Sequence, residues 1–150
     1  MTTATTTNTQ RENPRLDEII AAHQGREAPL MPILNDVQAE FGCVSEDTKR
    51  HIAEALNLTR AEVHGMVSFY HDYHETKATL PILKLCRAEA CQSRGSEALA
   101  AKAEAMANGR AEIESVYCLG LCSVGPNAMI GGSVHARLDE PALEALIREL

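Results

Sequence analysis

The sequence lacks any cluster of basic residues and any long apolar run. The 150 residues include 21 acidic and 14 basic side chains, which gives a formal charge of −7. A nucleic-acid partner requires a clustered basic face that displaces counterions, so the charge argues against this class of function. No stretch approaches the roughly 18 apolar residues that span a bilayer, so we expect no membrane insertion.

Targeting signals are also missing. The first residues show no basic region followed by an apolar core, and no Arg occurs among the first ten, as an Arg-rich transit peptide would require. We therefore expect a cytoplasmic protein. Six of these ten residues are threonines with little to bury, so residues 1–15 are predicted to form a flexible tail.

Nucleotide-binding and redox-enzyme motifs are absent as well. The chain has no G-x-G-x-x-G fingerprint, no Walker-type loop and no C-x-x-C pair. No internal repeat of roughly 20 to 50 residues is visible. The sequence therefore predicts no nucleotide site and no thiol–disulfide active site on this chain, and no residue is assigned a catalytic role.

The composition that is present suits a globular protein, with 45% apolar and 23% charged residues. Residues 16–78 are predicted to form an N-terminal helical domain. Helices are expected over Leu30–Phe41, from Ser45 to about Asn57 and from Thr59 to Tyr70 because apolar residues recur there at helical spacing. Capping signals flank these segments: Gly42, Ser45, and Thr59 with Glu62 three residues on.

Residues 79–150 show a different pattern, after a polar segment over His71–Thr79 that we interpret as a linker. Short apolar strands alternate with helical stripes, and a Gly-Gly pair suits a tight hairpin turn. A small mixed sheet covered by two helices, an α/β arrangement, is therefore expected. The predicted elements are a strand over Pro81–Cys86, a helix over Ser96–Asn108, a strand over Ile113–Tyr117, a hairpin around Gly131-Gly132, and a helix from Asp139 that buries Leu143, Leu146, Ile147 and Leu150.

Four of the five cysteines fall into two pairs, each at the end of a predicted strand. Cys86 and Cys91 have four residues between them, Cys118 and Cys122 have three, and 26 residues separate the pairs. Iron–sulfide cores bind thiolate strongly, and four thiolates complete two tetrahedral irons. Cys86, Cys91, Cys118 and Cys122 are therefore predicted to bind one [2Fe–2S] cluster.

Other uses of these cysteines remain open at this point. Structural zinc also takes four thiolates, usually from knuckles with about two to four residues between ligands. Disulfides need an oxidising compartment, which the missing signal peptide disfavours. Buried cysteines can also serve as small hydrophobic residues, and this is the expected role of Cys43, which has no paired neighbour.

Residues beside the cysteines are candidates for adjusting a cluster. Arg87 places a positive charge next to Cys86, whereas Glu89 places a negative one there. Gly120 and Gly125 are expected to let backbone N–H groups approach the sulfurs closely because glycine has no side chain.

These motifs resemble one family. The two cysteine pairs, the stretch Cys118-Leu-Gly-Leu-Cys122-Ser-Val-Gly-Pro126 and the stretch Val63-His-Gly-Met-Val-Ser-Phe-Tyr70 are similar to the thioredoxin-like [2Fe–2S] subunit of NADH:quinone oxidoreductase. The similarity runs from about residue 28 to residue 150. It implies a helical bundle followed by a thioredoxin-like ferredoxin domain in which the four cysteines bind the cluster.

The insert between the cysteine pairs is shorter than in the respiratory members of this family. This departure favours a resemblance to the gamma subunit of molybdenum-containing, NAD-dependent formate dehydrogenase, although NAD-reducing hydrogenases carry a similar subunit. The resemblance implies an electron-transfer role beside a partner with FMN, a nicotinamide site and a [4Fe–4S] cluster. FMN, NAD and the molybdenum cofactor are expected on partner subunits, the last on a larger catalytic subunit.

Overall fold

The computed structural model describes the backbone of residues 6–150 and the side chains from Pro14 onward. Its internal contacts divide the chain into two compact units, one ending at Ala78 and the other running from Thr79 to Leu150. We call these the helical unit and the sheet unit. Among the described residues, none of the helices is both long and apolar enough to cross a membrane.

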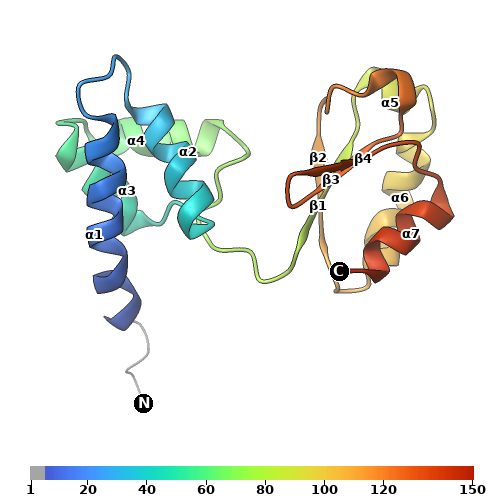
Figure 1. Ribbon diagram of the computed structural model, residues 1–150, viewed down its shortest axis with the longest axis horizontal. Helices are drawn as coiled ribbons and strands as arrows, with labels where there is room; N and C mark the ends of the chain where they lie inside the picture. The colour runs from blue at the N-terminus through green and yellow to red at the C-terminus, as the bar shows by residue number, and fades with distance from the viewer. Residues whose placement is uncertain (1–5) are drawn as a thin grey trace. The chain divides into compact units, whose positions relative to one another are not determined.

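The helical unit contains the three predicted helices, whose ends lie within two residues of the predicted ones (Figure 1). Gly42 adopts a left-handed conformation with φ of 75°, and its N–H bonds to the Gln38 carbonyl, ending the first predicted helix. The Ser45 hydroxyl accepts from the Thr48 N–H, and Thr59 with Glu62 forms the full capping box. The helices are α1 (Thr6–His23), α2 (Leu30–Phe41), α3 (Glu46–Ala55) and α4 (Arg60–Phe69).

Helix α1 differs from the flexible tail predicted over residues 1–15, because it already begins at Thr6. Polar residues such as Gln10, Arg11 and Glu12 have good helix propensity, so they extend a helix in which Leu16 is buried. The tail prediction relied on the absence of residues to bury, which does not by itself prevent a helix. Residues 1–5 lie outside the described part of the chain.

The segment after α4 packs against the helical unit over much of the predicted linker. Tyr73 is only 8% exposed, and its hydroxyl donates to Asn35 Oδ1 at 2.8 Å. The His74 carbonyl accepts from the Val44 N–H at 2.7 Å. This packing was missed because one aromatic residue in a polar segment gives no periodic signal. Tyr73 joins a core that includes Leu16, Ile20, Ile33, Leu34, Val37, Ile52, Val63 and Val67.

The sheet unit is built on a four-stranded mixed sheet with strand order β2-β1-β3-β4. Strand β1 pairs parallel with β2 and antiparallel with β3, and β3 forms an antiparallel hairpin with β4. The predicted α/β class with a small mixed sheet is confirmed. The strands are β1 (Ile82–Cys86), β2 (Glu112–Val116), β3 (Ala128–Ile130) and β4 (Ser133–His135).

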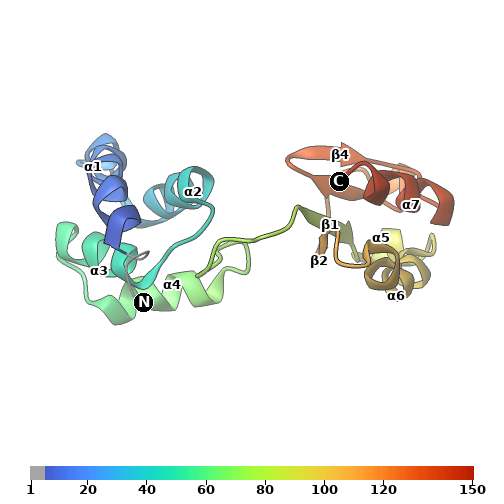
Figure 2. The ribbon, with the colours of Figure 1, turned by 90° about the horizontal axis from the view of Figure 1, so that it is seen from below.

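Helices α6 (Ser96–Ala107) and α7 (Glu140–Arg148) lie on the same side of the strands in both views (Figures 1 and 2). Asp139 caps α7 by accepting from the Ala142 N–H at 2.9 Å. The core between helices and sheet contains Leu83, Leu85, Leu99, Ala103, Ala128, Leu143 and Ile147. Leu150 was predicted to be buried but is 38% exposed, because it lies beyond the end of α7.

Candidate iron–sulfur site

Two of the predicted ligands lie at one edge of the sheet because β1 and β2 run in the same direction. Cys86 is the last residue of β1 and lies opposite Val116, the last residue of β2. Cys118 follows two residues later with a φ of 95°, which turns the chain away from the sheet. The parallel pairing therefore brings the starts of both cysteine loops to the same edge.

The other two ligands lie on short helical segments. Cys91 belongs to α5 (Glu89–Gln92), and Cys122 opens the 3-10 turn η1 (Cys122–Val124). Sequence reasoning missed both segments, because four and three residues are too few to show helical periodicity. Their effect is to bend each loop back toward its first cysteine.

The four sulfurs approach one another in pairs. The Sγ atoms of Cys118 and Cys122 are 3.6 Å apart, and the thiols of Cys86 and Cys91 are hydrogen-bonded to each other. Cys86 and Cys91 are each 1% exposed, whereas Cys118 and Cys122 are exposed. Two pairs of thiols suit two tetrahedral irons, each of which needs two thiolates besides the bridging sulfides.

Backbone hydrogen bonds favour the thiolate form of Cys86. Burial alone would raise the pKa of this thiol, but hydrogen bonds from backbone N–H groups and from the Cys91 thiol together outweigh burial, so the pKa is lowered. The N–H donors belong to Ala88, Cys118 and Leu119. The two cysteine loops thus present N–H groups to the same sulfur, and such groups stabilise negative charge on a cluster ligand.

The pKa values of Cys91 and Cys122 are shifted upward, opposite to that of Cys86. Burial, followed by the neighbouring Cys86, raises the pKa of Cys91. The hydrogen bond with Cys118 is the main cause of the raised pKa of Cys122. Within each pair, ionisation of one thiol therefore disfavours ionisation of the other, and bound iron would supply the positive charge that lets all four ionise.

Gly125 allows the backbone of the second loop to reach the sulfur of the first. A Cβ atom at this position would lie 2.9 Å from Cys91 Sγ, closer than real Cβ contacts. The backbone of Gly125 therefore lies close to a sulfur, while the predicted approach of its N–H group stays a prediction. At Gly120 the backbone conformation favours glycine, because φ is 81°. A close contact does not explain this glycine, since a Cβ there would meet nothing within 4 Å beyond its chain neighbours.

The positive charge of Arg87, predicted beside Cys86, is paired with the carboxylate of Glu97 on α6. The Arg87 guanidinium donates to both oxygens of the Glu97 carboxylate, at 2.8 and 2.5 Å. Glu97 is the first cause of the raised pKa of Arg87, and Arg87 lowers the pKa of Glu97. This pair ties the first cysteine loop to α6 and balances the positive charge of Arg87.

The donor set, its pairing and the close backbone approach therefore fit a two-iron cluster. The model of one family, described as thioredoxin-like [2Fe–2S] ferredoxin, matches residues 16–150. The chain belongs to this ferredoxin family. Membership implies a [2Fe–2S] cluster, and it extends over the helical unit as well as the sheet unit.

Ferredoxin relatives with known names are subunits of larger oxidoreductases. An NADH-quinone oxidoreductase subunit of Rhizobium meliloti (strain 1021) is 29% identical, and the match covers 93% of this chain and 87% of the relative. NADP-reducing hydrogenase subunit HndA of Solidesulfovibrio fructosivorans is 24% identical, and the match covers 83% of this chain and 78% of the relative.

A solved structure shares the ferredoxin fold. The NAD+-reducing [NiFe]-hydrogenase in its H2-reduced state aligns with a TM-score of 0.64 and 22% identity over 77% of this chain. The match covers 21% of the hydrogenase chain, so this ferredoxin corresponds to about a fifth of that longer protein. At this identity the likeness concerns the fold.

A second polar cluster, in the helical unit, was missed by sequence reasoning. The Lys49 side chain is fully buried, and its ammonium bonds to Glu46, to Glu75 Oε1 at 2.6 Å and to His64 Nδ1 at 3.2 Å. Glu46, His64 and Glu75 lie close enough to share a metal ion. Because Lys49 already places a positive charge among these three side chains, we interpret the cluster as structural. The sequence contained one signal for the cluster: Glu46 and Lys49 are oppositely charged and lie three residues apart on a helix.

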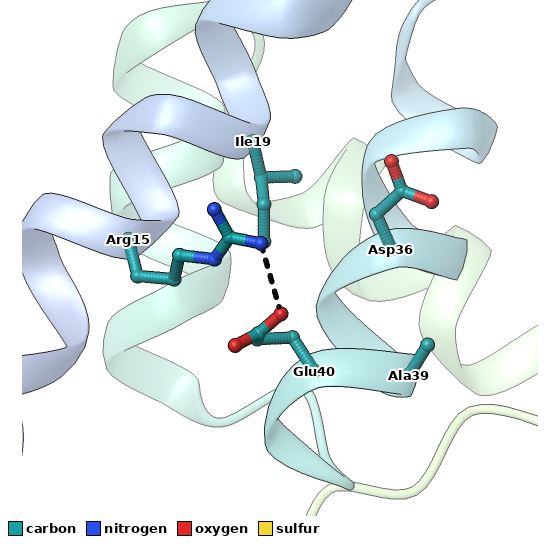
Figure 3. Close-up of a pocket in the computed structure, with 5 residues that line it drawn as sticks. All are labelled: Arg15, Ile19, Asp36, Ala39 and Glu40. Carbon is teal, nitrogen blue, oxygen red and sulfur yellow. Dashed lines mark hydrogen bonds and ion pairs between the residues drawn. The ribbon is translucent and has the colours of Figure 1, made fainter.

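A shallow pocket lies between α1 and α2 of the ferredoxin's helical unit (Figure 3). Arg15 Nη2 donates across it to Glu40 at 3.2 Å, and Ile19, Asp36 and Ala39 complete the lining. Glu18 and Glu40 raise the pKa of Arg15. The arrangement is an exposed ion pair between neighbouring helices and presents no chemistry for catalysis.

Proposed function

We propose that this chain is an electron-transfer subunit that holds one [2Fe–2S] cluster on Cys86, Cys91, Cys118 and Cys122. The observation that carries the proposal is the pairing of the four thiols at one edge of the sheet, with one pair buried and the other exposed. A bound cluster supplies a one-electron carrier. Such a carrier needs buried ligands that hold it on one side and exposed ligands through which electrons reach a partner on the other.

The residues of the chain divide these two tasks. Cys86 and Cys91, with the backbone N–H groups around Cys86, hold the carrier and exclude water from its inner side. Cys118 and Cys122 bring it to the surface. Tyr117 is 71% exposed and Leu121 is 39% exposed beside them, so a redox partner has an apolar rim on which to pack.

The proposed partner is a subunit of an NAD(P)-linked oxidoreductase that carries FMN, a [4Fe–4S] cluster and the NADH site. The names of the relatives support this proposal, since they are subunits of NADH-quinone oxidoreductases and of an NADP-reducing hydrogenase. Formate, hydrogen or a quinone reacts elsewhere in such an assembly, and this chain relays electrons. A cytoplasmic location remains part of the proposal.

For the parent complex we propose an NAD-dependent formate dehydrogenase with a larger molybdenum-containing subunit, which converts formate and NAD+ to CO2 and NADH. The supporting feature is the spacing of 26 residues between the cysteine pairs, shorter than in the respiratory resemblance. The relatives named above favour a quinone-linked or hydrogenase complex, which are the two alternatives.

Metal content tests the cluster proposal against a zinc-stabilised interaction domain. Protein purified without oxygen should be reddish, contain iron and acid-labile sulfide in equal amounts, and give an electron paramagnetic resonance signal once reduced. Cys122→Ser should lose most of this iron because it removes one of four ligands. Cys43→Ser is the matched control, and it should retain the iron because Cys43 lies in the helical unit.

Two outcomes would contradict the assignment. A colourless protein with one bound zinc would favour the interaction domain, in which the thiolates only stabilise the fold. Equal iron loss from Cys122→Ser and Cys43→Ser would mean that the ligand set is wrong.

A further inference from the structure

Asn127 connects the two cysteine loops and lies directly before β3. Its side chain is 1% exposed. Its Nδ2 donates to the Leu121 carbonyl at 2.9 Å, within the second loop, and to Cys91 Sγ at 3.7 Å, within the first. Its backbone carbonyl accepts from the Cys86 N–H at 2.9 Å. One buried residue thus touches both members of the buried cysteine pair.

The orientation of the Asn127 amide follows from its neighbours. The Leu121 carbonyl can only accept a hydrogen bond, so the amide nitrogen must face it, and the second N–H is then left for Cys91 Sγ. The opposite atom, Oδ1, is buried and has no hydrogen-bond partner among the residues that the structure describes. Burying an unpaired carbonyl oxygen costs free energy, so packing alone would favour an apolar side chain such as leucine.

We propose that Asn127 is a positioning residue that raises the reduction potential of the cluster through its Nδ2–H···Sγ bond to Cys91. This inference rests on the proposed function. One-electron reduction adds negative charge, which is shared by the ligand sulfurs, and an N–H donor stabilises the more negative state more than the oxidised one. Removal of the donor therefore lowers the potential.

Two isosteric variants isolate the side chain. Asn127→Leu removes both N–H donors with little change in shape, and Asn127→Asp places carboxylate oxygens toward Leu121 O and Cys91 Sγ. Both leave the backbone N–H of Asn127, which also bonds to Cys91, in place. We expect Asn127→Leu to shift the reduction equilibrium about tenfold toward the oxidised form, about 59 mV for one electron, and Asn127→Asp to shift it further.

Redox titration of the intact chain, followed by the electron paramagnetic resonance signal, measures this shift. Ser96→Ala is the packing control: Ser96 is also buried in the sheet unit, and its hydroxyl has no partner among the described residues. Its potential should match the wild type. An unchanged potential in Asn127→Leu, or an equal shift in Ser96→Ala, would overturn the proposal. Wild-type protein without iron would overturn the proposed function instead, so the two failures are distinguishable.

A measurement on the wild type covers the case in which both Asn127 variants lose their cluster. Asparagine labelled with 15N in the side-chain amide is incorporated during growth, and the reduced protein is examined by pulsed electron paramagnetic resonance. A 15N hyperfine coupling to the cluster is expected because the amide nitrogen is hydrogen-bonded to a ligand sulfur. Absence of this coupling would show that the bond is not made in the loaded protein.

Discussion

The backbone at Gly125, in the second cysteine loop, lies against the sulfur of Cys91 in the first. This contact leaves no room for a side chain at position 125. The Cβ of an alanine would lie 2.9 Å from Cys91 Sγ and 3.6 Å from the Cys91 Cα. The sulfur cannot move away freely, because Cys91 is 1% exposed and its neighbours surround it. One added methyl group would therefore displace a predicted cluster ligand.

We expect Gly125→Ala to weaken cluster retention and to destabilise the folded protein by about 1–3 kcal/mol, as overpacking does elsewhere. Iron content after desalting and urea unfolding measure the two effects. Gly65→Ala is the matched control, because Gly65 lies inside α4 and the added methyl group would meet nothing within 4 Å outside the neighbouring backbone of its own helix. It should leave the iron unchanged and stabilise the helix by about 0.5–1 kcal/mol. Full iron content in Gly125→Ala would contradict the close contact.

The roles of some single residues can be predicted from the sequence, and those of others cannot. Cysteine has a restricted chemistry, so the spacing of Cys86, Cys91, Cys118 and Cys122 predicts a cluster directly. Gly125 was also predictable, since it follows a cysteine loop. Asn127 was not, because an asparagine after a proline suits many turns, and its bond to Cys91 depends on tertiary contacts between residues 36 positions apart.

At the scale of elements, prediction succeeded where local signals were strong. The capping residues Gly42, Ser45 and Thr59 located helix ends to within a residue or two, because caps satisfy the backbone groups at those ends. The short segments α5 and η1 carry no such signals, although they position Cys91 and Cys122. Their conformation depends on the loop as a whole, as does the burial of Tyr73.

Lys49 joins three segments of the helical unit through one buried ammonium group. Its partners come from the first turn of α3 (Glu46), from α4 (His64) and from the segment after α4 (Glu75). Burial would lower the pKa of Lys49, but the two carboxylates outweigh burial and raise it. Lys49 in turn is the main cause of the lowered pKa of Glu46. The cluster thus stabilises the fold while Lys49 is charged.

We expect Glu75→Gln to destabilise the protein by about 1–2 kcal/mol at pH 7, because it removes one carboxylate from a buried ammonium group. The estimate stays low because the Glu75 side chain is 51% exposed. A group with a raised folded-state pKa contributes stability that is complete below its unfolded pKa, about 10.4 for lysine, and is lost as the pH rises through the folded value. The difference between variant and wild type should therefore shrink above about pH 11.

Urea unfolding across this pH range, followed by the circular dichroism of the helices, provides the measurement. Glu18→Gln is the control, since it removes an exposed ion pair with Arg15 in the same unit and should have little effect at any pH. A destabilisation by Glu75→Gln that stayed constant above pH 11 would show that the charge on Lys49 is not its cause.

At the scale of the whole molecule, the two units have separate hydrophobic cores. The sheet unit contains all four predicted ligands, whereas the helical unit contains the Lys49 cluster, Cys43 and the exposed ring of Phe69, which is 72% exposed. In the proposed function this chain relays electrons, so its activity depends on partner subunits. The identity of the parent complex is therefore a property of the assembly, and the four cysteines carry no direct information about its substrate.

Purification of the intact complex that contains this chain distinguishes the proposed parent complexes. A tagged copy of this chain, expressed in its native host and purified without oxygen, should bring down a flavin-containing subunit and a larger molybdenum-containing subunit. The preparation should reduce NAD+ with formate, and it should not do so with hydrogen. An untagged strain is the control for non-specific capture. Nickel with hydrogen-dependent NAD+ reduction, or membrane subunits with NADH-dependent quinone reduction, would overturn the formate assignment. Either result would leave the proposed electron-transfer role intact, because the cysteines proposed as cluster ligands lie within this chain.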